Sequence, residues 1–301
     1  MKITFAHMGN IYIPLRALLE RLGVDYLIPP PITKKTLTIG AQMGPEFACF
    51  PLKINLGNFV ETLELGADSI VMAGGLGPCR FGYYAQVQKK ILEDYGYKFD
   101  MYIINQQPKI IIDKIKEITG LRLTWLDIIR DFSFGWKKLK ATEEMETLAH
   151  KIRPYELKKG DTTRAYRKAL KLIDEASTNK EVEEAWDKGR ELIGSVPTRE
   201  PQEGALKVGI VGEIYTVLEP FVNFDLEIKL GEMGIEVERM VYLSHWLEGL
   251  VPVLGTMQKR KVYKAARPYL KYPVGGEGIE SVGNTVLYAQ QGFDGVIHLL
   301  P

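Results

Sequence analysis

Short apolar runs alternate with segments of helical periodicity over residues 1–110, and this alternation restricts the fold more than any other feature of the sequence. It predicts strands at residues 3–5, 25–28, 69–73 and 101–104, and helices at residues 13–22, 52–65 and 83–95. A β/α order of this kind is typical of a mostly parallel sheet covered by helices on both faces. Ligands of such sheets bind beyond the carboxyl ends of the strands. The pattern therefore places residues 8–10 and 74–79 at the functional edge.

The β/α pattern returns after a helical middle part. Residues 108–194 are predicted to form charged helices, and residues 195–204 have the proline, glycine and charge content of a linker. Beyond it, residues 206–215 repeat the pattern of residues 3–12, and residues 292–298 repeat that of residues 66–72. We therefore predict an α/β protein with two Rossmann-like lobes, each with a mostly parallel sheet, that flank a helical insertion.

This repeat also predicts the domain organisation. Residues 1–110 are expected to form an α/β lobe that carries both cysteines, residues 111–203 a helical insertion with a linker, and residues 204–301 a second α/β lobe. In the repeat Asp68 corresponds to Asp294, so Pro301 corresponds to Gly75 and lies about four positions before the counterpart of Cys79. Because both faces of a parallel sheet are normally covered, we expect the second lobe to be incomplete.

Composition excludes several classes of protein and of partner. With 46% hydrophobic and 26% charged residues, the chain has the usage of a folded globular protein rather than of a disordered or coiled-coil one. Its 39 basic and 38 acidic residues argue against nucleic acid or an anionic membrane as a partner. The first residues lack the pattern of a signal peptide, and no uninterrupted apolar stretch approaches about 20 residues. A cytoplasmic location is expected.

The two cysteines, Cys49 and Cys79, lie in loops rich in proline and glycine that precede predicted helices. A helix N-terminus favours the thiolate that metals require, because the helix dipole and free N–H groups stabilise negative charge there. Arg80 adds a positive charge beside Cys79. Free cysteines are also common as small buried hydrophobic residues, so the positions alone leave metal binding and core packing open.

Other residues give weaker signals. His7 and His298 follow predicted strands at the presumed cleft, where each is either a hydrogen-bonded loop residue or a catalytic base. Either one could join Cys49 and Cys79 in a zinc site. The glycine-rich turn at residues 275–283 could hold an anion, but it matches no phosphate-binding motif.

Six segments carry a resemblance to a known family. They are His7-Met-Gly-Asn10, residues 29–31, the two cysteine loops at residues 46–53 and 74–84, residues 212–215 and residues 275–281. Together they resemble the 2-hydroxyglutaryl-CoA dehydratase D-component superfamily, in particular its branch of CoA-substrate-specific enzyme activase-related proteins. The similarity extends over essentially the whole chain, and the cysteine loops are its most specific part.

The resemblance implies an oxygen-sensitive iron-sulfur protein that receives low-potential electrons from an ATP-dependent activase. Relatives dehydrate 2-hydroxyacyl-CoA, reduce aromatic acyl-CoA or carry a double-cubane cluster, and they commonly act as dimers. Cys49 and Cys79 match two ligand positions of the 4Fe-4S or double-cubane cluster, and a third family cysteine would follow Pro301. Near the cofactor we expect residues from the start of each lobe, Gly9 and Asn10 in the first and Gly212 and Glu213 in the second. We also expect Arg80 of the second cysteine loop there.

Two readings of the function remain open. In the first the chain is an iron-sulfur dehydratase or reductase component, or an electron carrier to one, with an acyl-CoA or another small molecule as substrate and a homodimer as its assembly. In the second it is a metal-free, two-lobed binding or scaffold protein.

Overall fold

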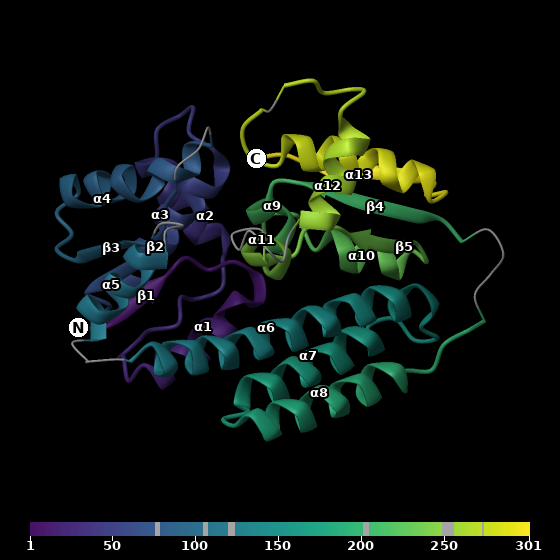
Figure 1. The fold of residues 1–301 in the computed structure, drawn as a ribbon, viewed down its shortest axis with the longest axis horizontal. Helices are drawn as coiled ribbons and strands as arrows, with labels where there is room; N and C mark the ends of the chain where they lie inside the picture. Colours follow the sequence, from purple (N-terminus) through teal and green to yellow (C-terminus); the bar gives the residue numbers. More distant parts are fainter. Residues whose placement is uncertain (76–78, 105–107, 120–123, 201–204, 249–255, 273) are drawn as a thin grey trace. The chain divides into compact units, whose positions relative to one another are not determined.

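A computed structural model describes residues 1–75, 79–104, 108–119, 124–200, 205–248, 256–272 and 274–301 (Figure 1). The chain divides into two compact units, Met1–Ser133 with Pro301, and Phe134–Leu300. Each unit is described by itself. The three-part division expected from the sequence stays a prediction, and part of its linker, residues 201–204, lies outside the described residues. None of the described helices is both long and apolar enough to cross a membrane.

The first unit is a parallel sheet between helices. Its elements are β1 (Ile3–Phe5), η1 (Gly9–Ile11), α1 (Tyr12–Arg21), α2 (Lys34–Met43), α3 (Phe50–Glu64), β2 (Ser69–Ala73), η2 (Arg80–Tyr83), α4 (Tyr84–Asp94), β3 (Asp100–Ile104) and α5 (Pro108–Thr119). The strands are parallel in the order β1-β2-β3, and Ser69 pairs with both Ile3 and Asp100. Buried side chains of α3 and α4 cover one face, and α1 and α5 contribute to the cluster on the other. The prediction of a parallel sheet covered on both faces is confirmed.

The strand predicted at residues 25–28 is reduced to a single parallel bridge between Ile3 and Tyr26. The Ile3 N–H donates to the Asp25 carbonyl at 2.9 Å, and the Leu27 N–H donates to the Ile3 carbonyl at 2.7 Å. Three prolines at residues 29–31 follow, and proline has no N–H to continue a ladder. Strand pairing at this edge of the sheet therefore stops at the bridge.

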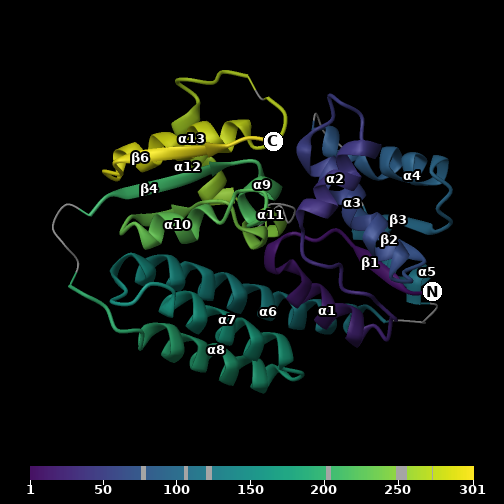
Figure 2. The ribbon, with the colours of Figure 1, turned by 180° about the vertical axis from the view of Figure 1, so that it is seen from behind.

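The second unit contains most of α6 and a second parallel sheet. Its further elements are η3 (Arg153–Tyr155), α7 (Asp161–Glu175), α8 (Asn179–Gly194), β4 (Lys207–Gly212), α9 (Ile214–Leu218), α10 (Leu226–Glu232), β5 (Glu236–Arg239), α11 (Leu243–Glu248), α12 (Thr256–Ala266), α13 (Gly278–Gln290) and β6 (Gly295–Leu299). The helix α6 spans Trp125–Ile152, and α7 and α8 lie beside its second half (Figures 1 and 2). The strand order is β5-β4-β6, all parallel.

The two sheets repeat one another, as the sequence predicts. In the first sheet β1 lies between the bridge at Tyr26 and β2, and in the second sheet β4 lies between β5 and β6. In both sheets the first strand is therefore flanked by the two strand segments that follow it in the chain. The same hydrogen bond occurs in each lobe. In the first, the Lys2 N–H just before β1 donates to the Asp68 carboxylate just before β2, at 2.7 Å. In the second, the Lys207 N–H at the start of β4 donates to the Asp294 carboxylate just before β6, at 2.8 Å. This correspondence confirms the two-lobed α/β fold with mostly parallel sheets.

A buried ionic cluster joins α6 to the second sheet within the second unit. Arg239, at the end of β5, donates to both carboxylate oxygens of Glu227 on α10, at 2.9 and 3.2 Å, and also pairs with Glu146 on α6. His150 of α6 lies 3.4 Å from the Glu227 carboxylate. The Arg239 guanidinium also stacks on the Tyr242 ring at 4.5 Å. Because its charges are buried, removing one partner from this cluster leaves the others uncompensated.

Candidate functional site

Both cysteines lie at the carboxyl edge of the first sheet. Cys49 is the N-cap residue of α3, and because α3 runs back to the start of β2, its first turn lies at the end where the strands finish. Cys79 is the N-cap residue of η2, in the loop that follows β2. Both are free thiols, Cys49 partly buried against the core of the sheet and Cys79 exposed. The part of this loop at residues 76–78 lies outside the described residues.

Arg80 joins the two cysteine loops. Its guanidinium Nη1 donates to the Phe47 carbonyl at 3.3 Å, so the residue after Cys79 is bonded to the residue two before Cys49. Within the loop that carries Cys49, the Lys53 ammonium donates to the Glu46 carbonyl at 2.9 Å. These contacts bring the predicted site residues Cys49, Cys79 and Arg80 into one region of the sheet edge.

Close backbone packing brings Gly82 against Gly75 in the second cysteine loop. A Cβ atom on Gly82 would lie only 2.3 Å from the Gly75 carbonyl oxygen, so a side chain at residue 82 would push the loop away. The ring of Phe81 packs edge-on against that of Tyr84 at 5.6 Å. Glycine is therefore required at residue 82 to fold the chain back after Cys79.

The end of β1 reaches the same edge. Gly9 has a φ of 51°, in the left-handed region, and with Asn10 it forms the short helix η1. Asn58, fully buried on α3, fixes this loop: its Oδ1 accepts from the His7 N–H at 3.1 Å, and its Nδ2 donates to the Pro30 carbonyl at 3.0 Å. Sequence reasoning missed Asn58, which lies within an apolar helical run.

The predicted residues of the second lobe have local structural contacts. Gly212 has a φ of 141°, and a Cβ atom there would lie 2.1 Å from the Leu299 carbonyl oxygen, so this position needs glycine where β4 meets β6. The Glu213 carboxylate caps α9, accepting from the N–H groups of Tyr215 at 3.0 Å and Thr216 at 2.9 Å. The role of both residues in cofactor binding stays a prediction.

Glu277 is a carboxyl group close to Glu213 that the sequence analysis did not single out. Glu277 is the N-cap residue of α13, which precedes β6 as α3 precedes β2. Burial, and then the negative charge of Glu213, raise the pKa of Glu277 to about 7. With these two carboxylates together, the glycine-rich turn at residues 275–283 is a poor place for an anion, contrary to the weak suggestion of the sequence.

The donor set available for a metal is small. Among the residues that the structure describes, no three His, Cys, Asp or Glu side chains are grouped so that they could hold a metal ion. Cys49, Cys79 and His7 are all described, and they do not form the three-ligand zinc site considered from the sequence. A metal at this edge would draw its further ligands from elsewhere.

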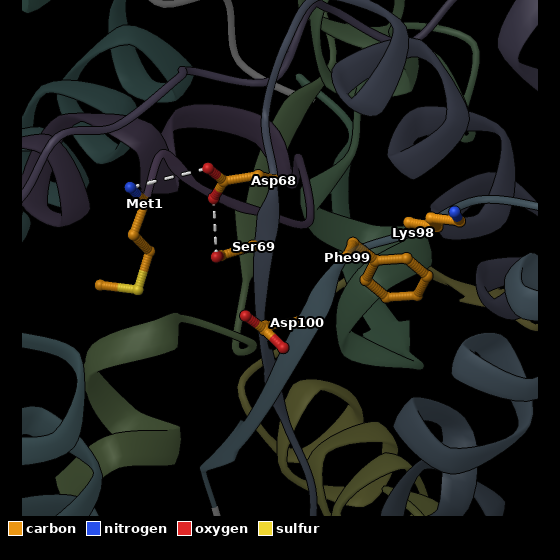
Figure 3. A pocket seen from close by; sticks show the side chains of 6 residues that line it. All are labelled: Met1, Asp68, Ser69, Lys98, Phe99 and Asp100. Carbon is orange, nitrogen blue, oxygen red and sulfur yellow. Dashed lines mark hydrogen bonds and ion pairs between the residues drawn. The ribbon is translucent and has the colours of Figure 1, made fainter.

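A shallow pocket lies at the opposite, amino edge of the first sheet (Figure 3). It is lined by Met1, Asp68, Ser69, Lys98, Phe99 and Asp100. The Asp68 carboxylate is engaged there by the Lys2 N–H, by the Ser69 hydroxyl at 2.8 Å and by the terminal ammonium at 3.6 Å. These contacts serve the strand pairing, so the carboxyl edge with the cysteine loops is the better candidate site.

Comparison with known families gives one match. The family model described as "CoA enzyme activase uncharacterised domain (DUF2229)" matches residues 6–241, which is most of the chain and includes both cysteine loops. No curated protein matches the chain.

Proposed function

Because the chain belongs to the family of CoA enzyme activase uncharacterised domains, we propose that it is an iron-sulfur redox component of an acyl-CoA dehydratase activase system. Cys49 and Cys79 would supply thiolate ligands to the cluster. The observation that carries the proposal is the hydrogen bond from Arg80 to the Phe47 carbonyl, since it holds together the two loops that present the thiols.

The chemistry of the donor set suits an iron-sulfur cluster. Thiolates are the usual ligands of such clusters, and both thiols lie at helix N-termini, where negative charge is favoured. Neither cysteine side chain caps its own helix by a hydrogen bond. The guanidinium of Arg80 adds a positive charge that would favour the reduced, more negative state of a cluster.

Two thiolates are half of the four that a typical cluster takes. We also propose a homodimer, and in one arrangement a cluster shared by the two copies would take two of its ligands from each. A cluster shared by two copies would give about two iron atoms per chain for a four-iron cluster, whereas one cluster in each copy would give about four. The ratio of iron to chain therefore distinguishes the two arrangements.

When bound, the cluster would supply low-potential one-electron chemistry, with an ATP-hydrolysing activase as electron donor. The residues of the chain would hold and tune it. Phe47, 89% exposed, and Tyr83, 65% exposed, lie within the two cysteine loops and present aromatic rings that a partner could contact. Covering them would exclude water from the thiolates, and lower solvent exposure changes the reduction potential of such a site.

Anaerobic reconstitution tests the proposal. The wild-type protein should take up iron and sulfide and absorb at about 400 nm, as thiolate-iron clusters do. Cys49→Ser and Cys79→Ser should each lose most of the iron. Thr178→Ser is the matched control, because it places serine at another helix N-cap and should keep the wild-type content. Wild-type protein without iron, or serine variants that retain it, would refute the proposal.

A second candidate function is a metal-free binding or scaffold protein. The observation that favours it is that no three potential metal ligands are grouped among the described residues. It predicts that both serine variants bind their partner or ligand as tightly as the wild type does, so the same variants decide between the two functions.

A further inference from the structure

The second lobe carries a segment of unusual charge, residues 259–272, which we call the basic segment. It contains Lys259, Arg260, Lys261, Lys264, Arg267 and Lys271. No Asp or Glu occurs from residue 249 to residue 276, although the chain has 38 acidic residues among 301. A chain that is almost neutral as a whole therefore concentrates positive charge in one short stretch.

Packing turns these charges outward. The other side of α12 is fixed against α13 by Val262 and Ala266, which are 5% and 1% exposed. The two helices approach so closely that a Cβ atom on Gly283 would lie 2.3 Å from the Val262 carbonyl oxygen. All six basic side chains of the segment are exposed. The surface they form is one side of a helix together with the turn that follows it.

Most of these cations have no carboxylate partner. Elsewhere in the chain exposed lysines pair with a carboxylate four residues later, as Lys89 does with Glu93 and Lys171 with Glu175. In the part of the chain that the structure describes, no such ion pair is made by five members of the basic segment: Arg260, Lys261, Lys264, Arg267 and Lys271. Their charge is available to an outside partner.

Exposed aromatic side chains lie among the cations. Tyr263, Tyr269 and Tyr272 are 44%, 72% and 79% exposed, and only the first is held by a carboxylate, with its hydroxyl donating to Glu280 at 3.2 Å. Tyrosine and arginine are among the residues enriched where proteins bind one another. Small ligands bind in concave pockets lined mostly by apolar side chains, so exposed cations along a helix suit a macromolecule better.

We propose that the basic segment is a docking surface for an acidic segment of a partner protein. Two other anionic partners fit less well. A nucleic acid would extend past this short segment onto the rest of the chain, which holds more carboxylates than cations. An anionic membrane normally takes up the apolar face of a basic helix, but that face of α12 is already packed on α13. The proposal is independent of the iron-sulfur site.

Fluorescence anisotropy with a labelled, glutamate-rich peptide of about 20 residues tests the proposal, at NaCl concentrations of about 50 and about 300 mM. The wild type should bind the peptide saturably and more weakly at the higher salt. Charge reversal at Arg260→Glu, Lys264→Glu and Arg267→Glu together should weaken binding about tenfold or more.

The control reverses three exposed cations of α7 and α8, Arg167→Glu, Lys168→Glu and Lys188→Glu, and should change binding less than about twofold. If the triple charge-reversal variant unfolds, the combined variant Arg260→Gln, Lys264→Gln and Arg267→Gln is measured in its place. Absence of wild-type binding, or an equal loss in the control, would overturn the proposal. So would binding at least about tenfold tighter to a single-stranded DNA of equal length or to anionic vesicles.

Discussion

Replacing Asn58 by leucine should destabilise the first unit and loosen the loop at the end of β1. The side chain of Asn58 is fully buried on α3 and bonds to main-chain groups of two other segments, the His7 N–H and the Pro30 carbonyl. Leucine has a similar volume, so the change leaves no large cavity. The change removes the Oδ1 acceptor of the His7 N–H and the Nδ2 donor to the Pro30 carbonyl.

The magnitude follows from the groups left behind. An unpaired buried main-chain group costs about 1–3 kcal/mol, and the His7 and Pro30 groups are only partly buried, so the lower half of that range applies to each. For Asn58→Leu we therefore expect a loss of about 2–4 kcal/mol in the free energy of unfolding of the first unit. A loss of that size is a large fraction of the usual total stability of a domain, about 5–15 kcal/mol.

Amide hydrogen exchange measured on peptides from β1 and α3 reports this loss for the first unit alone. Faster exchange in these peptides is expected, without a change in peptides from α8. Asn179→Leu is the control, because Asn179 is exposed on α8 and its substitution should cost less than about 0.5 kcal/mol. If Asn58→Leu falls within that same limit, the two hydrogen bonds do not hold the loop.

Two further predictions concern buried groups. Burial raises the pKa of Glu227, but the charges of Arg239 and His150 outweigh it and lower the pKa to about 2. Because this folded pKa lies below the ordinary value, Glu227→Gln should lose about 3 kcal/mol at pH 7, and urea unfolding should show that difference shrinking as pH falls from about 4.5 to about 2. Gly57→Ala should lower the thermal midpoint, at a cost of about 3 kcal/mol, because its Cβ atom would lie 1.9 Å from the Thr36 carbonyl oxygen; Gly194→Ala, in open space, should not lower it.

The sequence was a good guide to the regular parts of the fold because apolar periodicity and the internal repeat are local patterns. The prediction at residues 69–73 coincides with β2, and the repeat of Asp68 in Asp294 corresponds to the same hydrogen bond in each lobe. The positions of Cys49 and Cys79 before helices could be predicted for the same reason, since proline and glycine mark the loops that precede them.

Features that depend on tertiary contacts could not be predicted in this way. Helix α2 was missed because its stability depends on a close crossing with α3, where a Cβ atom on Gly40 would lie 1.7 Å from the Lys53 carbonyl oxygen. Asn58 was missed because its partners lie 28 and 51 residues away. The link from Arg80 to Phe47 also spans two loops that are separate in sequence.

We propose above all that Cys49 and Cys79 belong to one site. Phenylarsine oxide tests it directly, because trivalent arsenic bridges two thiols only when they can approach one another. Mass spectrometry of reduced, metal-free protein should show one arsenical per chain and both cysteines protected from iodoacetamide, with the protection lost in Cys49→Ser and in Cys79→Ser. Independent alkylation of both thiols in the presence of the arsenical would contradict the claim.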